Sequence, residues 1–593
     1  MAKANKIDSN VTGLRYAEEV SLGVLPASPV WKPLEPNSYN DFGGQITTVA
    51  RNPINPSRQR KKGVVTDLDA SGGFNSDLTQ ENMQDILQGF FFASLRRKGE
   101  MEYFTFSKNF VATPATDQLA ITSHGLKTGQ GPLQASSTTT LPAGLAAATD
   151  YWPIVVDDDN IKLATSYANA IAGTAIDITD AGTGTHTLAS VAGVTAVDDS
   201  FEVSDPSKFK ANSLVRSTGF ATEANNGIHL VSAVTGNLVA VGTALTDEVG
   251  PAGAKLVVIG HQGASGDLSI DASGSFPALV SVALDFTTLG LIPGEWVFVG
   301  GDLAAEAFDE TENNGLKRIR SIAANRIEFD KSALAMTTDA GAGKTIRLYF
   351  GRVLKNELGS DVIRRSYNIE RTLGAPETSL PNQIQAEYLV GAVPSEISIN
   401  VPQANKLTLD VSFMATDNEQ REAAEGLKAG SRPAIVEADA FNTSSDFVRL
   451  KMSKVEADEA PVALFAFLTE LTITINNNLT PNKAVAVLGA FDVTAGTFQV
   501  GGNVTAYFSD IAAVKAVREN ADVTIDMALV KANSGMVIDI PLVALGDGRL
   551  NVQQDQAIQL PLSMDAATAA KIDPDLDYTA MWVFFDYLPD LAG

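Results

Sequence analysis

Cysteine is absent from this chain of 593 residues. Its absence excludes disulfide bridges, zinc–thiolate sites and catalysis by a thiol. Histidine is scarce, and the four residues present are His124, His186, His229 and His261. None lies in a metal-binding motif or at the spacing of metal ligands. We therefore expect surface or turn histidines and no metal site.

Long apolar runs are also missing, because no stretch of 18 apolar residues exists and residues 1–8 lack the apolar segment of a signal peptide. We expect neither a membrane-spanning segment nor a secretory leader. Residues 341–345 imitate the end of a phosphate-binding loop. However, position 338 is threonine instead of glycine, and residues 346–350 read as a strand where that motif requires a helix.

Catalytic and calcium-binding patterns are not found either. The acidic residues 157–160 lack the spaced ligands of a calcium loop and read as a solvated hairpin turn. No Ser/His/Asp arrangement and no isolated carboxylate pair stands out among the acids. We expect a protein that is not an enzyme and holds no cofactor.

Positive charge is in short supply, with 44 Lys and Arg against 70 Asp and Glu, a net charge of −26. This balance argues against tight wrapping of nucleic acid, which requires cations to neutralise phosphates. It suits a surface that repels a polyanion. A hydrophobic fraction of 45% is ordinary for folded proteins, and the length predicts several domains.

Two stretches of the chain repeat one order of features: a strand, a long polar loop, a Gly-Gly strand and a short helix. The first spans residues 43–95 and the second residues 471–517. Matching Pro56 to Pro481 and Gly72-Gly73 to Gly501-Gly502 changes the register by only four residues. Duplication is the favoured interpretation, and two unrelated strand–helix units are the alternative.

Between the two copies lie segments with frequent turn signals and no long helical pattern, which predicts small all-β modules. Two of them resemble each other, since Asn-Asn-Gly occurs at 225–227 and at 313–315 between strand-like runs, as in tight turns. The expected organisation is an arm (1–42), a first core domain (43–108 plus 353–430), modules at 109–191, 192–262 and 263–352, and a second core domain (431–593).

The polar loop of the first copy carries the one concentration of positive charge: Arg51, Arg58, Arg60, Lys61 and Lys62. A nucleic-acid site would interleave such cations with aromatic residues, which are missing here. Contact with the acidic surface of a neighbouring copy is the favoured interpretation.

Residues 15–34, 49–63 and 67–79 resemble the N-terminal region of tail tube (major tail) proteins of long-tailed, non-contractile bacteriophages. Residues 121–188 are similar to a β-module inserted in phage structural proteins. The resemblance implies a mainly β fold with two tandem tail-tube-type β-sandwich or barrel domains. Each would carry a short α-helix, and the inserted modules would decorate the core.

The resemblance also implies a structural subunit that assembles into stacked rings, forming a hollow conduit for DNA ejection. Two core domains in one chain would make a ring of three subunits with pseudo-sixfold symmetry. The basic loop would stack rings, and Asp410, Asp522 and Asp526 are candidate acids of the lumen.

Expected partners are other copies of the chain, tape measure, terminator and distal tail proteins, double-stranded DNA without tight binding, and host surface glycans through the modules. We expect the protein in the virion, after assembly in the host cytoplasm. Two rival hypotheses are a tail fibre or adhesion protein that displays the β-modules, and a polysaccharide-degrading enzyme with a carboxylate pair.

Overall fold

A computed structural model describes residues 7, 9–54, 56, 59–374, 384–455, 462–465, 467–571, 573 and 575–589. The chain divides into two compact units. The first is built from the residues up to Leu95 and from Val353–Phe584, and the second from Arg96–Arg352 with a short stretch after Phe584.

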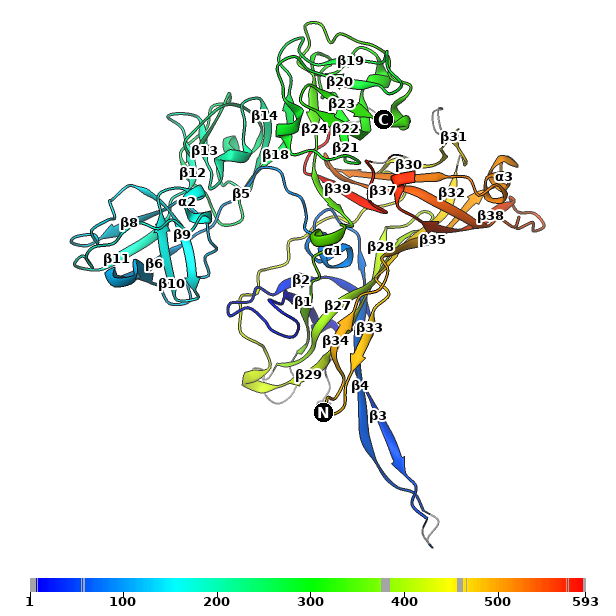
Figure 1. The fold of residues 1–593 in the computed structure, drawn as a ribbon, viewed down its shortest axis with the longest axis horizontal. Helices are drawn as coiled ribbons and strands as arrows, with labels where there is room; N and C mark the ends of the chain where they lie inside the picture. The colour runs from blue at the N-terminus through cyan, green and yellow to red at the C-terminus, as the bar shows by residue number, and fades with distance from the viewer. Residues whose placement is uncertain are drawn as a thin grey trace, which may run out of the picture. The chain divides into compact units, whose positions relative to one another are not determined.

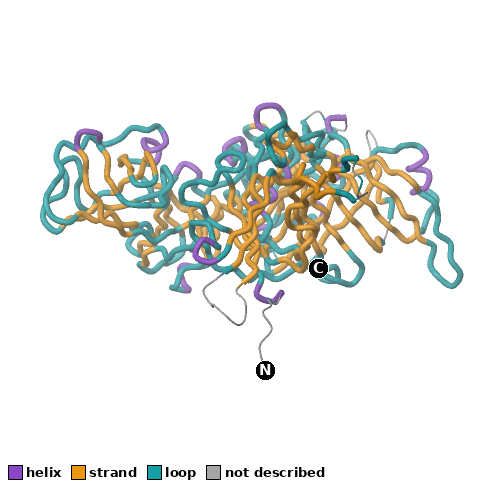
Figure 2. Tube along the Cα trace, turned by 90° about the horizontal axis from the view of Figure 1, so that it is seen from below, coloured by secondary structure: helices purple, strands orange, loops and turns teal. Residues whose placement is uncertain are grey.

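Strands dominate both units, as the tube drawing in Figure 2 shows. The α-helices found in the described residues are short: α1 (Gln84–Phe91), α2 (Tyr167–Ile171) and α3 (Ala512–Arg518). The predicted mainly β fold, with one short helix in each core domain, is therefore confirmed. The insertions are mainly β as well, but the module expected at 109–191 also contains the short helix α2.

The first unit contains one set of antiparallel strands in the order β3-β4-β28-β27-β26-β1-β2 (Figure 1). The strands are β1 (Gly13–Glu18), β2 (Lys32–Leu34), β3 (Pro36–Arg51), β4 (Lys61–Asp77), β26 (Tyr367–Gly374), β27 (Gln385–Val401) and β28 (Thr408–Ala415). In addition, β29 (Asp417–Arg421) pairs with the N-terminal half of β27.

A second set in the same unit has the same order, β32-β35-β38-β37-β36-β30-β31. Its strands are β30 (Phe447–Lys454), β31 (Val462–Ala463), β32 (Leu468–Asn476), β35 (Gln499–Tyr507), β36 (Val523–Lys531), β37 (Ser534–Asp547) and β38 (Gln559–Ala566). Here β39 (Met581–Phe585) pairs with β37. Every strand of the first set thus has a counterpart.

Irregularities of the ladders recur at equivalent places. A register shift follows Pro36 in β3 and Leu468 in β32, and another follows Tyr367 in β26 and Val523 in β36. Bulges are local departures that chance would not repeat at matched positions. The pattern supports duplication over the alternative of two unrelated units.

The structure shifts by one residue the alignment of Gly72-Gly73 with Gly501-Gly502 that the sequence suggests. Phe74 and Val504 both face the core, so Gly72 is equivalent to Gly502 and not to Gly501 as the sequence match has it. Glycine has no side chain to mark which face of the strand it lies on, and the alternation of its neighbours decides the register.

One hydrophobic core serves both copies of the repeat. Alternate residues of β27, β28 and β32 point into it, among them Ile399, Val411 and Ile473, each at most 2% exposed. Helix α1 contributes Ile86 and Phe90 to the same core. Each such side chain adds about 1.5–3 kcal/mol of hydrophobic stabilisation when fully buried.

The second unit begins with a closed barrel in the order β10-β7-β6-β11-β8-β9. Its strands are β6 (Ser107–Thr113), β7 (Gln118–Ala120), β8 (Leu133–Ser137), β9 (Asp150–Asp157), β10 (Asn160–Ala164) and β11 (His186–Ser190). Acidic residues 157–160 form the exposed β9–β10 hairpin turn, as predicted.

A larger sheet follows, and its order β12-β13-β16-β15-β14-β18-β24-β21-β22-β23-β20-β19 is symmetric about the β18–β24 pair. Its strands include β12 (Gly193–Thr195), β13 (Ser200–Glu202), β14 (Ser213–Thr218), β15 (Gly227–Thr235), β16 (Leu238–Val241), β18 (Lys255–Gln262), β19 (Ser269–Asp271), β20 (Ala278–Val280), β21 (Trp296–Val299), β22 (Gly315–Ala323), β23 (Arg326–Phe329) and β24 (Arg347–Tyr349).

The two Asn-Asn-Gly sequences do not form tight hairpin turns. Asn226 holds the backbone of Phe220 through both its amide atoms, and Asn314 holds Phe308 in the same way. Each asparagine therefore fastens a loop ahead of β15 or β22. The matched contacts extend the likeness of the two halves of this sheet.

Candidate functional site: the polar face and the strand edges of the first unit

The sheet face that points away from the core is polar across both copies of the repeat. Asn75 and Asn400 donate hydrogen bonds to the two carboxylate oxygens of Asp410, at 2.8 and 2.7 Å. Across the next pair of strands, the Ser398 and Thr474 hydroxyls lie 2.9 Å apart. Side chains from four neighbouring strands, β4, β28, β27 and β32, thus form one connected surface.

Beyond β4, which carries Lys61 and Lys62 at its far end, the strands of this surface carry charge of a single sign. Strands β27, β28, β32, β35 and β38 contain no Lys and no Arg, while Glu396, Asp410, Glu470 and Asp565 lie on them. Asn476 donates a 2.6 Å hydrogen bond to Glu396, which orients this carboxylate without neutralising it. Acids that form no ion pair within the described part of the chain give a negative potential that repels phosphate groups.

The three acids predicted for the lumen lie in different environments. Asp410 lies on the polar face. Asp526 in β36 has a side chain only 5% exposed, and it forms an ion pair with Arg449 of β30. Asp522 precedes β36 outside any strand, where its backbone carbonyl accepts a hydrogen bond from Val455.

Two strands from different copies of the repeat join the surface into one sheet. The C-terminal half of β27, Glu396–Val401, pairs antiparallel with Leu471–Asn476 of β32. Ile397 lies opposite Ile475, and Asn400 lies opposite Thr472. This junction pairs the strand edges of two equivalent domains.

The sequence analysis did not predict the junction or the polar network. Both leave a signal in the alternation of polar residues, Glu396, Ser398 and Asn400 in one strand and Thr472, Thr474 and Asn476 in the other. The signal shows that one face is polar, but it cannot show which strands are neighbours.

The counterpart of β32 in the first copy is β3, and β3 uses only one of its edges. In the described residues β3 pairs with β4 alone, whereas β32 pairs with both β35 and β27. An unpaired strand edge presents backbone donors and acceptors that readily accept another strand.

The tip of the β3–β4 hairpin carries the basic residues. Segment 52–63, predicted as a loop, is shorter than expected because β4 starts at Lys61, and the hairpin extends far from the core (Figure 1). Arg51, Arg60, Lys61 and Lys62 are exposed, and none forms an ion pair within the described part of the chain. Arg58 lies outside the described residues.

In the second copy, the segment equivalent to this hairpin tip folds back. There β33 (Thr480–Lys483) and β34 (Ala490–Thr494) form a hairpin, and Lys483 forms ion pairs with Asp67 and Asp69 of β4. The cation of the second copy is thus satisfied within the chain, whereas the cations of the first copy are not.

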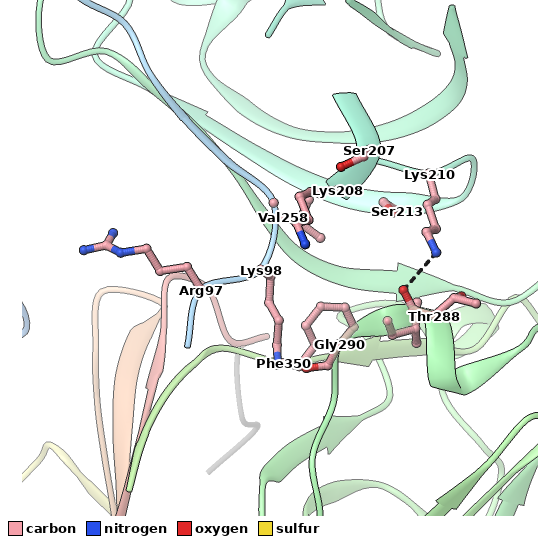
Figure 3. A pocket seen from close by; sticks show the side chains of 12 residues that line it. Arg97, Lys98, Ser207, Lys208, Lys210, Ser213, Val258, Thr288, Gly290 and Phe350 are labelled. Carbon is pink, nitrogen blue, oxygen red and sulfur yellow. Dashed lines mark hydrogen bonds between the residues drawn. The ribbon is translucent and has the colours of Figure 1, made fainter. Parts of the chain in front are cut away.

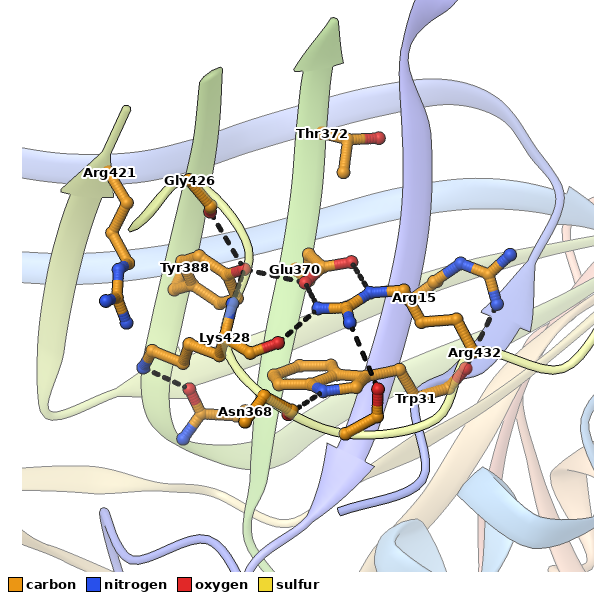
Figure 4. A network of polar contacts seen from close by, with 12 residues as sticks. Arg15, Trp31, Asn368, Glu370, Thr372, Tyr388, Arg421, Gly426, Lys428 and Arg432 are labelled. Atoms are coloured by element: carbon orange, nitrogen blue, oxygen red, sulfur yellow. Dashed lines mark hydrogen bonds and ion pairs between the residues drawn. The ribbon is translucent and has the colours of Figure 1, made fainter. Parts of the chain in front are cut away.

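A buried ionic cluster holds the linker segment, which is the stretch between β29 and β30 that connects the two copies (Figure 4). Glu370 of β26 is fully buried and accepts two hydrogen bonds from Arg432, at 3.1 and 2.6 Å, and one from Tyr388 at 2.6 Å. The Arg432 guanidinium lies over the Trp31 ring. Burial, together with the bond to Glu370, raises the pKa of the Tyr388 hydroxyl. The cluster attaches the linker segment to the β1–β26–β27 sheet.

The histidines are not surface residues, contrary to the sequence prediction. All four are at most 6% exposed, and His229 bonds the hydroxyls of Ser217 and Thr243 at 2.9 and 2.6 Å. Within the described residues, no group of three or more His, Cys, Asp or Glu side chains could hold a metal ion.

Residues 341–345 are not a phosphate-binding loop in the structure, as predicted. Lys344 is held by the carbonyls of Ala304 and Ala307 and by Asp309, and the chain continues into strand β24. No helix begins there to bind a phosphate.

Comparison with known proteins gives one family. The family model described as phage tail tube protein matches residues 9–255 and 257–566, which is most of the chain. A search of curated proteins finds no match. Among the helices of the described residues, none has the length and apolar character needed to cross a membrane.

Proposed function

Since the chain belongs to the family of phage tail tube proteins, we propose that it is a structural subunit that assembles into rings, which stack into a conduit for DNA ejection. The observation that carries the proposal is the duplicated sheet joined edge to edge within one chain. A junction that already joins two equivalent domains can be repeated between chains until a ring closes.

The junction between β27 and β32 within one chain predicts the register of the junction between neighbouring chains. Ile397 and Asp547 occupy equivalent places, because their partners on β28 and β38 are Val411 and Leu562. By the same equivalence, residues 546–551 of one copy lie against residues 39–45 of the next, because the bulge of β3 after Asn40 adds one residue. Both segments lie in described parts of the chain, and the Asn551–Gln559 bridge already holds the first one beside β38.

Three chains then supply six equivalent sheets, and the edge of β3 that is unpaired in the described residues is covered by the next chain. The acidic face that includes Asp410 lines the lumen, so that like charge keeps DNA from binding the wall. The basic hairpin, on which Arg51, Arg60, Lys61 and Lys62 are exposed, contacts the acidic surface of the adjacent ring, and Arg58 is proposed to take part in the same contact.

The proposed core domains are those expected from the sequence, 43–108 plus 353–430 and 431–593, except that residues 96–108 belong to the second unit and that β1 and β2 of the arm pair with the first core domain. Modules 109–191, 192–262 and 263–352 lie outside the ring, because a narrow lumen leaves no room for them. Tape measure, terminator and distal tail proteins are the further partners, and the virion is the final location.

Host glycans are proposed as ligands of the modules. A cleft of about 820 Å³ in the second unit is lined by Trp152, Tyr167, Asp205 and Asn237 among others. Aromatic side chains beside carboxylate and amide groups suit the apolar faces and the hydroxyls of sugars.

Disulfide trapping tests the ring register, and the lack of native cysteine makes the readout clean. The double variant Asn40→Cys with Leu550→Cys has cysteines at the positions equivalent to Thr472 and Asn400, which are paired within one chain. In the proposed ring, Cys at position 40 of one chain therefore lies opposite Cys at position 550 of the next. Directly paired strand residues lie within the Cα separation of a disulfide. Oxidation of the assembled protein should give covalent dimers and closed trimers on a non-reducing gel.

Two controls accompany the experiment. Asn400→Cys with Thr472→Cys should form an intramolecular bridge, because these residues are paired in one chain. Each single cysteine variant should stay uncrosslinked beyond a trace of dimer. If the positive control forms its bridge while Asn40→Cys with Leu550→Cys yields only monomers, the proposed junction is wrong.

A further inference from the structure

A small hollow in the second unit is lined by positive charge (Figure 3). Its volume is about 260 Å³, and its wall comes from three segments far apart in the sequence, residues 97–99, 207–213 and 288–290, with Val258 and Phe350. The charged side chains in this wall are Arg97, Lys98, Lys208 and Lys210, and no carboxylate is part of it.

Four cations around one hollow are unusual in a chain of net charge −26. Two of them are matched by acids outside the wall, since Arg97 pairs with Glu100 at 2.7 Å and Lys98 pairs with Glu295 at 3.0 Å. Lys98 and Glu295 are both buried, so this pair is a fixed part of the structure.

The other two cations have no carboxylate partner in the described residues. The Lys210 ammonium group donates a 2.9 Å hydrogen bond to the backbone carbonyl of Thr288, which fixes its position without cancelling its charge. Lys208 is exposed and reaches into the middle of the hollow (Figure 3). Two like charges in the wall of one small hollow repel each other unless an anion lies between them.

The effect of Lys210 is also felt by a neighbouring side chain. Burial lowers the pKa of His261 to about 4 against the opposing effect of Asp267, and the Lys210 charge contributes a smaller share of the lowering. Lys210 is therefore close enough to act on this buried side chain.

The wall offers hydrogen-bonding groups beside the charges. Ser207, Ser213 and Thr288 contribute hydroxyl groups, and the apolar side chains of Val258 and Phe350 limit the access of water. In such a partly dry site, the attraction between an ammonium group and an anion is stronger than in bulk water.

We propose that this hollow binds a tetrahedral oxyanion of the phosphate type, held between Lys208 and Lys210. The volume accommodates one phosphate group with its waters, or the phosphate end of a phosphorylated sugar. Free phosphate and a sugar phosphate share the chemistry that the hollow recognises. The site is independent of the ring junction, so its failure would leave the proposed function untouched.

Isothermal titration calorimetry tests the proposal by measuring the affinity of the full chain for inorganic phosphate and, separately, for glucose 6-phosphate. Lys208→Gln and Lys210→Gln should each weaken phosphate binding at least tenfold. The matched control is Lys127→Gln, an exposed lysine of the barrel, which should bind as the parent does. Tighter binding of the sugar phosphate would identify a phosphorylated glycan as the source, and equal binding would identify free phosphate.

Thermal unfolding provides a second measurement, which distinguishes the loss of phosphate binding from a folding defect of the variant. Without phosphate, Lys208→Gln should unfold at a higher temperature than the parent, because a repulsion is removed. With phosphate the order should reverse, because only the parent gains stability from the ligand. Parent protein that does not bind millimolar phosphate, or lysine variants that bind it as the parent does, would overturn the proposal.

Discussion

The carboxylate of Glu370 shows at the scale of a single residue how the two copies of the repeat are held. It is completely buried and would be costly without partners, but Arg432 and Tyr388 satisfy it. Replacement by the neutral Glu370→Gln leaves the Arg432 charge without its partner. We expect a loss of about 3 kcal/mol in the free energy of unfolding, measured by urea denaturation.

The control for this variant is Lys406→Gln, which removes a more exposed ion pair with Asp77. Exposed pairs contribute less than about 1 kcal/mol, so the urea midpoint of the control should hardly move. Equal effects of the two variants would show that the buried cluster does not stabilise the linker.

His261 makes the stability of the second unit depend on pH. Its folded pKa is about 4, below the unfolded value of about 6.5, so only the unfolded chain binds a proton between these values. The contribution to stability is therefore complete above pH 6.5 and is lost as pH falls to 4. It amounts to about 3 kcal/mol at most.

Thermal unfolding of the parent and of His261→Asn from pH 7 to pH 4 checks this expectation. The parent should lose more stability than the variant over that range. His186→Asn serves as a matched control, as another buried histidine. Parallel curves for the parent and His261→Asn would contradict the assignment.

At the scale of the element, the Gly-Gly strand of the second copy depends on its glycine. Gly502 has φ +141°, and a Cβ added there would lie 1.9 Å from the carbonyl oxygen of Thr472 in the paired strand. Gly502→Ala should therefore cost about 1–3 kcal/mol and separate β35 from β32. Gly242→Ala, which has open space around it, should change stability little; hydrogen exchange of β35 amides distinguishes the two.

The basic hairpin is the second element with a testable role. Charge reversal by Lys61→Glu with Lys62→Glu should leave single rings intact but prevent their stacking, because in the proposed assembly the cations contact the acidic surface of the next ring. The length distribution of tubes in negative-stain images measures the effect. Lys255→Glu with Lys127→Glu, of equal charge change in the second unit, should leave tube length unchanged; shortened tubes in both variants would argue against a specific contact.

The sequence predicts which segments form strands better than it predicts the surroundings of a single side chain. Alternation and turn residues predicted the duplicated strand–helix unit, the β-modules and the strand after residue 345. They could not assign Asp526 to its environment, because its partner Arg449 comes from a strand 77 residues away. The histidines were misjudged for a similar reason, since His124, His186 and His229 bond groups of residues that lie elsewhere in the chain.

At the scale of the whole molecule, the account depends on the non-local pairing of β27 with β32. No local pattern predicts this pairing, because strand edges are chosen by the three-dimensional arrangement of two domains. The same pairing explains why one chain with two equivalent sheets suits a closed ring. A single-domain fragment would lack the internal junction.

Electron cryomicroscopy of the assembled protein tests the central claim most directly. We predict closed rings of three chains around a channel, with the first and second copies of the repeat at six equivalent positions and residues 39–45 paired with residues 546–551 of the next chain. Discrete fibres without a channel, or rings in which the two copies occupy unlike positions, would contradict the account.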